Sequence, residues 1–251
     1  MFIRQLVVVL PDNTWVLPIW YCRVPPGFRW IGPDDVSAGL YTRDGGKTWN
    51  EKAVPDSTGC VHINTVPLPL DKGYLAFYRS RWADCIYRST SFDSINWSAP
   101  EWTSLPNPNS GICATALPNG DVVMVFNDSS TYLGMELREG LYDNIIPAED
   151  PRVNQPEGSN GKVAIWGTPR KALSVGISRD EGKTWRYRVL EDGDGFCMTN
   201  DSKGRSNREL SYPSIYFDRS EGDKGVHISY THHRQSIRYV HIDDVAQFVG
   251  E

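Results

Sequence analysis

The sequence lacks any long apolar run. The N-terminal apolar stretch at residues 5–10 ends at Pro11. It is shorter than the roughly 7–15 residues of a secretory signal core, and far shorter than the roughly 20 residues that span a bilayer. We therefore expect a soluble chain with no membrane span, and interpret this stretch as a first β-strand. The compartment stays open: the chain is cytoplasmic as written, and extracellular if an upstream signal was removed.

Cysteines and histidines are few and scattered. The cysteines form no CxxC pair and no histidine cluster accompanies them, so neither a zinc site nor a thioredoxin-like motif is indicated. Their odd number fits reduced, buried thiols better than a full disulfide framework. We therefore expect no metal and no organic cofactor. The five cysteines are Cys22, Cys60, Cys85, Cys113 and Cys197.

The chain also has no excess of basic charge. Lys and Arg number 26 against 31 Asp and Glu, which gives a net charge of −5. A mildly acidic chain has no global attraction to nucleic acid or to an anionic membrane, so neither is expected as a partner. Aromatic residues are plentiful, with nine Trp and twelve Tyr. Such side chains suit both packed β-sheet and the stacking surfaces of sugar sites.

Long helical periodicity is absent, and short strand signals dominate instead. β-Branched and aromatic runs alternate with Gly, Asp, Asn and Pro, which is the pattern of strands joined by turns. The 17 prolines lie mostly between these runs, where a missing N–H costs little. The sequence therefore predicts an all-β protein. The clearest runs lie at 5–10, 15–20, 74–79, 121–127, 173–178 and 226–231.

One short motif repeats along the chain. The segment TRDGGKTW at residues 42–49 returns as SRDEGKTW at 178–185, and a shortened version, SFDSINW, occupies 91–97. Asp44 and Asp93 are 49 residues apart, close to the roughly 40–50 residues of one four-stranded propeller blade. The next interval, of 87 residues, fits one blade plus an insertion.

The composition of the motif predicts a hairpin turn. The Asp carboxylate can accept backbone N–H bonds inside the turn, while Gly supplies the positive φ that the turn needs. The Trp can cover the turn and pack between neighbouring sheets. We therefore assign a structural role, and no chemistry, to the Asp and Trp of the three copies: Asp44, Trp49, Asp93, Trp97, Asp180 and Trp185.

The two full copies resemble the Asp-box, or BNR, repeats of the sialidase (neuraminidase) superfamily. The resemblance covers most of the chain and implies a β-propeller of the sialidase type, with residues 1–251 as a single domain. It also implies a carbohydrate partner, an acidic glycan. Blades are expected near 5–54, 60–103, 107–190 and 209–243, with an insertion at 132–168 that forms a surface loop beside the pocket.

The number of blades departs from the family pattern. Sialidases are expected to have six blades, whereas four are recognisable here. Either two are too degenerate to see, or the chain is short of one or two N-terminal blades, which we favour because a strand begins almost at Met1. An incomplete ring would leave unpaired strand edges, which favour association. The oligomeric state stays open.

Two polar loops are candidates for substrate binding, because propeller ligands bind where loops enter the innermost strands. Arg79, Arg81 and Asp84 follow a clear strand, and guanidinium groups match carboxylates bidentately, so they could hold an acidic sugar. A surface salt bridge is the alternative. Asn107 and Asn109 lie in a stiff loop between prolines and offer donors and acceptors to sugar hydroxyls; a plain turn is the alternative.

The closing blade holds the catalytic candidates that the resemblance implies. Sialidases use a Tyr nucleophile paired with a Glu, because a neutral nucleophile approaches an anionic sugar without charge repulsion. Tyr212 fits the nucleophile. Glu209 is a local candidate for the base, although the family's Glu comes from a more distant segment.

Three further residues complete the candidate site. Arg170 begins the strand that leads into the last repeat, where it is either an anchor in the pocket or a solvated residue. Arg234 lies in a hairpin expected in the closing blade. His62 precedes a strand and could face the axis as an acid or base; a structural histidine is the alternative.

Three functions remain open from the sequence. The first is an exo-acting glycoside hydrolase on a sialic or uronic sugar, the second a polysaccharide lyase on a uronate-containing glycan, and the third a non-catalytic propeller that binds carbohydrate or protein. The family's Arg-Ile-Pro stretch is absent, and its acid is unassigned, with Asp34 and Asp35 as loop candidates. Fold alone does not choose among these functions.

Overall fold

The fold is known from a computed structural model, which describes residues 1–24, 26–27, 30–130, 157–192, 209–218 and 224–250. Within these residues the chain is nearly all β, as expected, with antiparallel sheets and one short helix. No helix in the described ranges is long and apolar enough to cross a membrane. Most of the insertion expected at 132–168, and Cys197, fall outside them. Cys22, Cys60, Cys85 and Cys113 carry free thiols.

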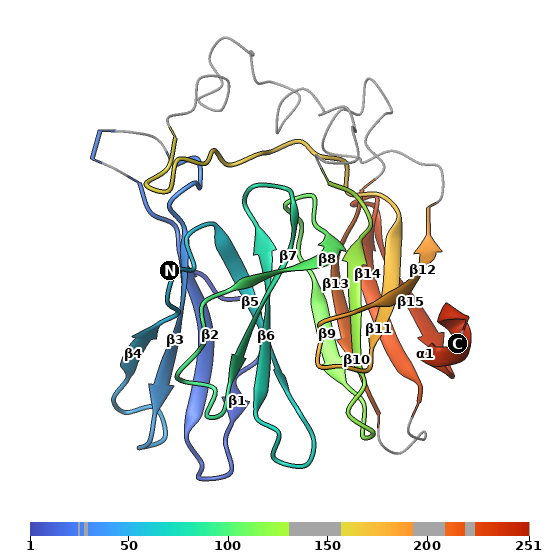
Figure 1. The fold of residues 1–251 in the computed structure, drawn as a ribbon, viewed down its shortest axis with the longest axis horizontal. Helices are drawn as coiled ribbons and strands as arrows, with labels where there is room; N and C mark the ends of the chain where they lie inside the picture. Colours follow the sequence, from blue (N-terminus) through green and yellow to red (C-terminus); the bar gives the residue numbers. More distant parts are fainter. Residues whose placement is uncertain (25, 28–29, 131–156, 193–208, 219–223, 251) are drawn as a thin grey trace.

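The strands form four sheets that follow one another along the chain (Figure 1). The first sheet contains β1 (Val8–Val9), β2 (Trp15–Tyr21), β3 (Val36–Thr42) and β4 (Asn50–Ala53). The second contains β5 (Cys60–Pro67), β6 (Tyr74–Ser80), β7 (Cys85–Ser91) and β8 (Glu101–Pro106).

In the last two sheets, as in the first two, strands that follow one another along the chain pair antiparallel. The third contains β9 (Cys113–Ala116), β10 (Val122–Asn127), β11 (Leu173–Ser178) and β12 (Arg186–Glu191). The fourth contains β13 (Leu210–Tyr216), β14 (Val226–His232) and β15 (Ser236–Ile242), and the helix α1 (Val245–Val249) follows it. Asp244 caps this helix by accepting a hydrogen bond from the Gln247 N–H.

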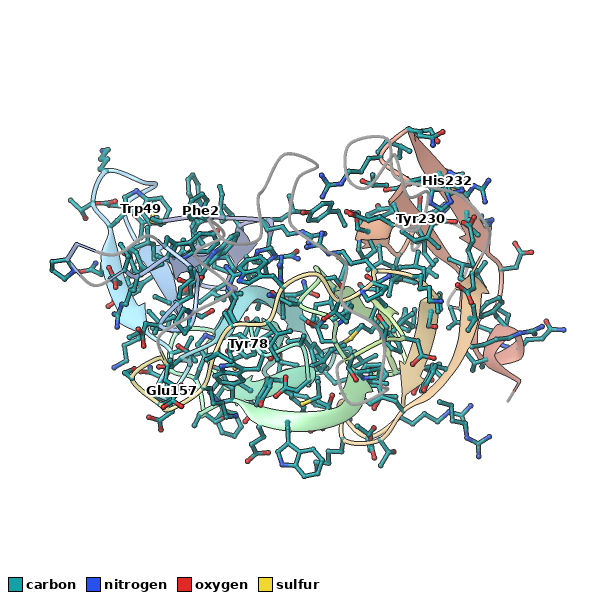
Figure 2. The ribbon with its side chains drawn as sticks, turned by 90° about the horizontal axis from the view of Figure 1, so that it is seen from above. Phe2, Trp49, Tyr78, Glu157, Tyr230 and His232 are labelled. Carbon is teal, nitrogen blue, oxygen red and sulfur yellow. The ribbon has the colours of Figure 1, made fainter. Side chains whose placement is uncertain are left out.

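Seen from above, the four sheets lie side by side in an arc (Figure 2). The first strands of the second, third and fourth sheets are neighbours, since β5 contacts β9 and β9 contacts β13. The first residues of these strands therefore lie close together, around one end of the central axis of the arc. This places the loops that precede β5, β9 and β13 around one shared region.

Burial follows the position of each strand in its sheet. Every residue of β10 and β11 is buried, because both faces of these central strands pack against neighbouring sheets. Val123 and Val125 pack with Ile228 between the third and fourth sheets. On the other side, Met124 and Phe126 of β10 pack with Phe77 of the second sheet. The continuous apolar run of β10 therefore suits a central strand that is buried on both faces.

The three repeat turns share one hydrogen-bond pattern. In the first, Asp44 Oδ1 accepts from the backbone N–H groups of Lys47 and Thr48, both at 2.9 Å, and Asp44 Oδ2 accepts from Thr48 Oγ1 at 2.6 Å. Asp180 makes the same contacts with Lys183 and Thr184. In the shortened copy, Asn96 replaces the Thr. The carboxylate therefore satisfies the turn's donors.

The tryptophans of these turns differ in burial. Each donates its indole N–H to a backbone carbonyl three residues earlier. Trp185 packs edge-on against Phe77 of the preceding sheet, with ring centroids 5.8 Å apart, and Trp97 is buried in the core of the second sheet. Trp49 is 40% exposed. Trp185 therefore covers the sheet before its own, and the cluster that holds Trp97 includes Val54, which follows β4 of the preceding sheet. The described residues place no sheet before the first, beside Trp49.

These turns predict a loss of stability in acid. Hydrogen bonds hold the pKa of Asp44 at about 2, with those from Thr48 the strongest, and they outweigh burial to hold Asp93 and Asp180 at about 2 as well. The pKa of an unfolded Asp is roughly 3.9. Stability from these carboxylates is therefore full above about pH 4 and is lost as the pH falls towards 2.

The Asp180→Asn variant tests this expectation. Its urea-unfolding free energy should be lower than that of the parent at pH 7, and should decline less between pH 5 and pH 3. Asp56→Asn is the control, since Asp56 is exposed in another turn with φ of 50°, which Asn tolerates. An equal pH slope in the parent and Asp180→Asn would contradict the assignment.

Candidate functional site

The inner strands of the second and fourth sheets have the same irregularity. The register of β5 shifts between Val61 and Asn64, and that of β13 shifts between Ser211 and Ser214. The residue at each bulge, His62 or Tyr212, has φ of 54°. Bulges re-aim a side chain, and non-glycine residues with left-handed backbone are concentrated at functional sites. The two side chains are thus presented at equivalent places on two inner strands.

Tyr212 belongs to a cluster with Arg170 and Glu209. Arg170 Nη1 lies 3.3 Å from the Tyr212 hydroxyl and 3.3 Å from Glu209 Oε1. Arg170 and Glu209 are buried, whereas Tyr212 is 41% exposed. The Leu210 N–H donates to the Arg170 carbonyl at 2.8 Å, which fixes the two segments together. One guanidinium therefore joins a buried carboxylate to a phenol that reaches solvent.

Glu209 is held as a carboxylate. Its Oε1 also accepts from Ser211 Oγ at 2.7 Å and from Arg234 Nε at 3.1 Å. Burial alone would raise the pKa of Glu209, but Arg170, Ser211 and Arg234 together lower it below its usual value. Arg234 reaches this position from the hairpin between β14 and β15, and its role here is to neutralise a buried negative charge.

The pKa of the Tyr212 phenol is lowered. Burial acts to raise it, but the positive charge and hydrogen bond of Arg170, together with the charge of Arg79, outweigh that effect. The phenol is therefore closer to ionisation than an exposed tyrosine. This is the state that favours a phenolic nucleophile.

Arg4 is a site residue that the sequence interpretation missed. Its guanidinium lies 5.0 Å from the Tyr212 ring centroid, and its Nη2 donates to the Pro213 carbonyl at 3.2 Å. Burial, and then the charge of Arg170, lower its pKa. A signal was available, because Arg4 is the only charged residue among residues 1–10.

Gly111 makes room for Arg4. A Cβ placed on Gly111 would lie 1.4 Å from Arg4 Nη1. The guanidinium therefore occupies the space that a side chain at this position would fill. A larger residue at position 111 must therefore displace the Arg4 guanidinium.

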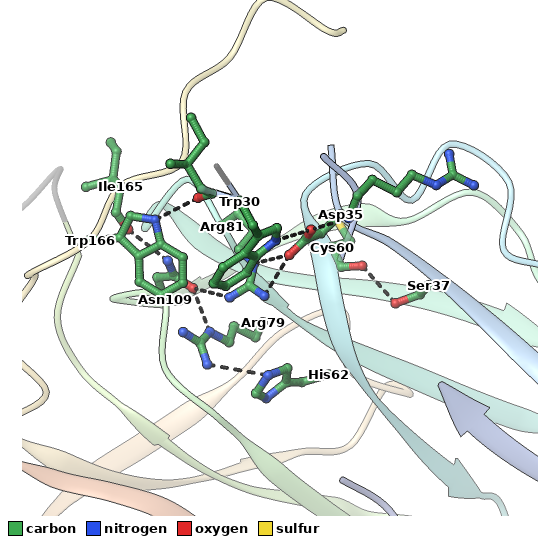
Figure 3. A network of polar contacts seen from close by, with 12 residues as sticks. Trp30, Asp35, Ser37, Cys60, His62, Arg79, Arg81, Asn109, Ile165 and Trp166 are labelled. Atoms are coloured by element: carbon green, nitrogen blue, oxygen red, sulfur yellow. Dashed lines mark hydrogen bonds and ion pairs between the residues drawn. The ribbon is translucent and has the colours of Figure 1, made fainter. Parts of the chain in front are cut away.

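A second group lies around Arg79. Arg79 Nε donates to Asn109 Oδ1 at 2.6 Å, and its Nη1 lies 3.5 Å from His62 Nε2 (Figure 3). Trp20 packs against the His62 ring at a centroid distance of 4.2 Å. Burial, followed by the charges of Arg79 and Arg81, holds the pKa of His62 well below its usual value. His62 is therefore a neutral imidazole facing a buried guanidinium.

Arg81 is held between two tryptophans. Its Nε and Nη2 contact Asp35 Oδ2 at 2.9 and 2.8 Å, and its guanidinium lies 5.3 Å from the Trp30 ring and 5.1 Å from the Trp166 ring. Figure 3 shows Arg81 between these groups, beside Arg79. Asp35 Oδ1 accepts from Trp30 Nε1 at 2.8 Å. Arg81 is thus saturated by protein contacts and serves as a wall of the site.

Residues 157–170, here called the strap, cross the top of the sheets (Figure 1). The Ile165 N–H donates to the Arg81 carbonyl at 2.7 Å, and Trp166 Nε1 donates to the Ile31 carbonyl at 2.9 Å. Asn109 Nδ2 donates to the Ile165 carbonyl at 2.8 Å. The strap is the described end of the expected insertion, and it joins the first three sheets beside the site.

Two candidates from the sequence lie behind the site and not in it. Asp84 accepts from the Tyr87 hydroxyl at 2.9 Å and from the Cys85 N–H at 2.7 Å. Asn107 accepts from the Ser80 N–H and donates to the Ser110 carbonyl. Both side chains form hydrogen bonds within or beside their own loops, since buried polar groups must be paired. They shape the loops that carry Arg81 and Asn109.

The two groups meet in one electropositive region. Beside the effect of burial, the charges of Arg4 and Arg170 lower the pKa of Arg79, and the charge of Arg170 lowers the pKa of Arg4. All three charges lower the pKa of His62, again beside burial. The described residues gather no set of three His, Cys, Asp or Glu side chains suited to a metal ion. The arrangement can hold an anion over Tyr212 while Glu209 lies behind it.

Comparisons with known proteins give the family and the fold of the chain. A family model described as a BNR repeat-like domain matches residues 1–228. A search of curated proteins finds no match. The chain is similar in structure to Hadza microbial sialidase Hz136, at 15% identity and a TM-score of 0.56, covering 94% of this chain and 36% of that one.

Two further solved structures are similar over almost the whole chain. One is the NanB sialidase from Streptococcus pneumoniae, with 12% identity, a TM-score of 0.53, and coverage of 94% of this chain and 30% of that one. The other is a protein of unknown function from Dyadobacter fermentans, with 16% identity, a TM-score of 0.54, and coverage of 92% and 49%. The chain spans about a third to a half of these proteins. At such identities the likeness shows the fold, and the expected sialidase-type β-propeller is confirmed.

Proposed function

Because the chain belongs to the family of BNR repeat-like domains, we propose that it is a sialidase-like, glycan-processing protein. Its activity is that of an exo-acting glycoside hydrolase on a terminal sialic or uronic sugar. Its three repeat turns are Asp-boxes that support the blades, and its partner is an acidic glycan bound at the axis.

One observation carries this proposal: Arg170 Nη1 lies 3.3 Å from both the Tyr212 hydroxyl and the buried Glu209 carboxylate. A hydrolase that attacks an anionic sugar needs a nucleophile without negative charge, and a carboxylate nearby to take its proton. Tyr212 supplies the first and Glu209 the second. The lowered pKa of Tyr212 supports this assignment.

The sugar carboxylate is bound by Arg4, Arg79 and Arg170. Three guanidinium groups that crowd one region repel one another, and burial lowers the pKa of Arg4 and Arg79 further. A bound carboxylate relieves this repulsion and accepts charge-assisted hydrogen bonds. Asn109 positions Arg79 for this contact, since its Oδ1 accepts from Arg79 Nε and its Nδ2 donates to the Ile165 carbonyl.

The chemistry follows from this placement. The Tyr212 oxygen attacks the anomeric carbon, the bond to the leaving oxygen breaks, and the Tyr212 proton passes to Glu209. The leaving oxygen takes a proton from water. Water then attacks the anomeric carbon of the tyrosyl intermediate as the bond to Tyr212 breaks, and its surplus proton neutralises the hydroxide left by the first step. Tyr212 recovers its proton from Glu209. A leaving group of low pKa needs the least protonation, so aryl glycosides are the appropriate first substrates.

A lyase is the second candidate, and His62 favours it. A neutral imidazole beside a guanidinium is the arrangement that removes a proton next to a carboxylate. In that reaction the base takes the proton at C5 of a uronate, the C4–O bond breaks to leave an unsaturated sugar, and the leaving oxygen takes a proton from water. A His62→Ala variant would then lose activity while Tyr212→Phe retained part of it.

The products distinguish the candidates. Purified protein is incubated with an aryl sialoside, with an aryl glucuronide and with a uronate-capped oligosaccharide, and release of the aryl group is measured beside the absorbance of unsaturated uronate. Hydrolysis should release saturated sugar and leave that absorbance unchanged. A rising absorbance would assign the lyase. A folded sample that acts on none of them would leave a binding propeller.

Gly111→Ala should weaken the hydrolase through Arg4. The added Cβ overlaps the mobile end of Arg4, so the guanidinium moves and the backbone does not. We expect KM to rise about tenfold, which corresponds to the loss of one charge-assisted hydrogen bond. The free energy of unfolding should change by less than about 1 kcal/mol. Gly39→Ala is the control, because its Cβ would lie 3.7 Å from Val16. An unchanged KM would contradict the role of Arg4.

A further inference from the structure

A groove lies at the end of the sheets opposite the strap. Three turns border it: the one between β1 and β2, the one between β5 and β6, and the one after β7. In Figure 1 the first two turns lie at the lower end of the molecule. The groove encloses about 300 Å³ and its apolar walls include Leu10, Pro11, Pro67, Leu68 and Phe92. This groove, the Phe92 groove, is remote from the candidate active site.

The Phe92 side chain does not contribute to the stability of the fold. It occupies the second position of the shortened repeat, where the two full copies have Arg43 and Arg179. The turn's hydrogen bonds come from Asp93 and its neighbours and do not involve this side chain. Phe92 is 94% exposed, so the aromatic ring gives up the burial that normally stabilises it.

Leu70, in the turn beside the groove, is equally unfavourable. It is 83% exposed and has φ of 58°, and the next residue, Asp71, has φ of 55°. Consecutive left-handed residues favour Asn, Asp and Gly, and a leucine there costs stability. Gly73 lies against the backbone of Ser91 and Phe92, so the two turns are in contact. Two large apolar side chains therefore project from adjacent turns at a cost to the fold.

Carboxylates accompany this apolar surface. Asp12, Asp71 and Asp93 all line the groove. The pKa of Tyr74, between them, is raised first by burial and then by the charges of these three residues. The groove thus has both apolar and acidic lining residues. That combination attracts a cation carried beside an apolar group, and repels anionic lipid head groups.

We propose that the Phe92 groove docks a polypeptide segment in which Leu or Phe alternates with Lys or Arg. Leu70 and Phe92 contact its apolar side chains, and Asp12 and Asp71 pair with its cations. The partner is a protein, and the surface acts independently of the glycan site at the other end of the blades.

The test uses a defined probe. A fluorescein-labelled, amidated peptide of sequence Gly-Ser-Lys-Leu-Lys-Phe-Gly-Ser is titrated with the full chain, and fluorescence anisotropy is measured. Two matched peptides replace both Lys by Glu, or Leu and Phe by Ser. Phosphatidylserine vesicles and maltohexaose serve as competitors. We expect saturable binding of the first peptide only, weakened by salt and unaffected by either competitor.

Two variants remove the groove's apolar contacts without harming the fold. Phe92→Arg restores the residue of the other two copies, and Leu70→Asn suits the left-handed turn. Each should weaken binding at least about tenfold, while the midpoint of thermal unfolding stays equal or rises. Arg179→Phe, added to Phe92→Arg, should not restore binding, because Arg179 follows β11 of the third sheet and does not line the Phe92 groove.

The outcomes are decisive in both directions. Loss of affinity in both variants, with unfolding midpoints kept, supports the proposal. Absence of binding at millimolar protein, or equal binding by Phe92→Arg, overturns it. So does binding to vesicles or to maltohexaose that Phe92→Arg removes, since this would assign the surface to a lipid or a sugar.

Discussion

Tyr212→Phe is expected to abolish turnover of an acidic aryl glycoside, with kcat/KM falling on the order of 10³-fold or more, because the variant removes the nucleophilic oxygen itself. The same substitution should leave folding unchanged. The phenol oxygen contacts Arg170 at 3.3 Å, while the ring, which lies beneath the Arg4 guanidinium, is retained in Phe. Initial rates and thermal unfolding of parent and variant measure both effects.

Tyr216→Phe is the matched control. Tyr216 lies on the same strand, is 63% exposed, and contacts the His227 ring away from the arginines. Its loss should change kcat/KM by less than about twofold, as expected for a surface substitution outside the site. A Tyr212→Phe enzyme that keeps more than a tenth of parental kcat/KM would exclude Tyr212 as nucleophile. Burst kinetics with the parent would support a covalent intermediate.

Asp35→Asn should cause the largest loss of stability, about 3–5 kcal/mol in unfolding free energy. Asp35 and Arg81 are both buried, and Asp35 Oδ2 receives both Arg81 contacts. An amide at this position leaves the guanidinium without its counter-ion in a place that water does not reach. The stacked Trp30 and Trp166 cannot replace a carboxylate, so the buried charge is uncompensated.

Asp34→Asn controls for the loss of one acidic residue in the same loop. Asp34 Oδ1 accepts from the Ser159 N–H at 2.7 Å, and an Asn carbonyl can accept the same bond. We expect a change within about 0.5 kcal/mol in guanidinium chloride unfolding. Similar losses in the two variants would mean that the Arg81–Asp35 pair does not support the fold.

The fold was readable because its signals are local. The central strand β10 has a continuous apolar run, and the two full copies of the repeated turn place an Asp, a Gly and a Trp at fixed spacing. Both features depend on neighbours within a few residues along the chain. The exposure of Trp49 could not be predicted from the sequence, since it depends on which sheet lies beside the turn.

The candidate site was readable only in part. Glu209 and Tyr212 lie in one short segment, and Arg170 begins a recognisable strand, so their proximity could be anticipated. Arg4, Asp35 and Trp166 could not be placed, because each meets partners more than 40 residues away. Asp84 has the right chemistry for a sugar ligand, but its own turn uses its carboxylate. Loop hydrogen bonds of this kind leave no pattern in the sequence.

The strap also bears on the order of folding. Trp166 bonds to Ile31, 135 residues earlier, and Ile165 bonds to Arg81 and Asn109 of the second and third sheets. Closing so large a loop has an entropy cost that is recovered only after its partners are in place. The strap therefore docks after the first three sheets have assembled, and the wall beside Arg79 and Arg81 is completed late. Tryptophan fluorescence should show a slow final phase of refolding that a Trp166→Phe variant loses, so the candidate site is completed after the rest of the fold.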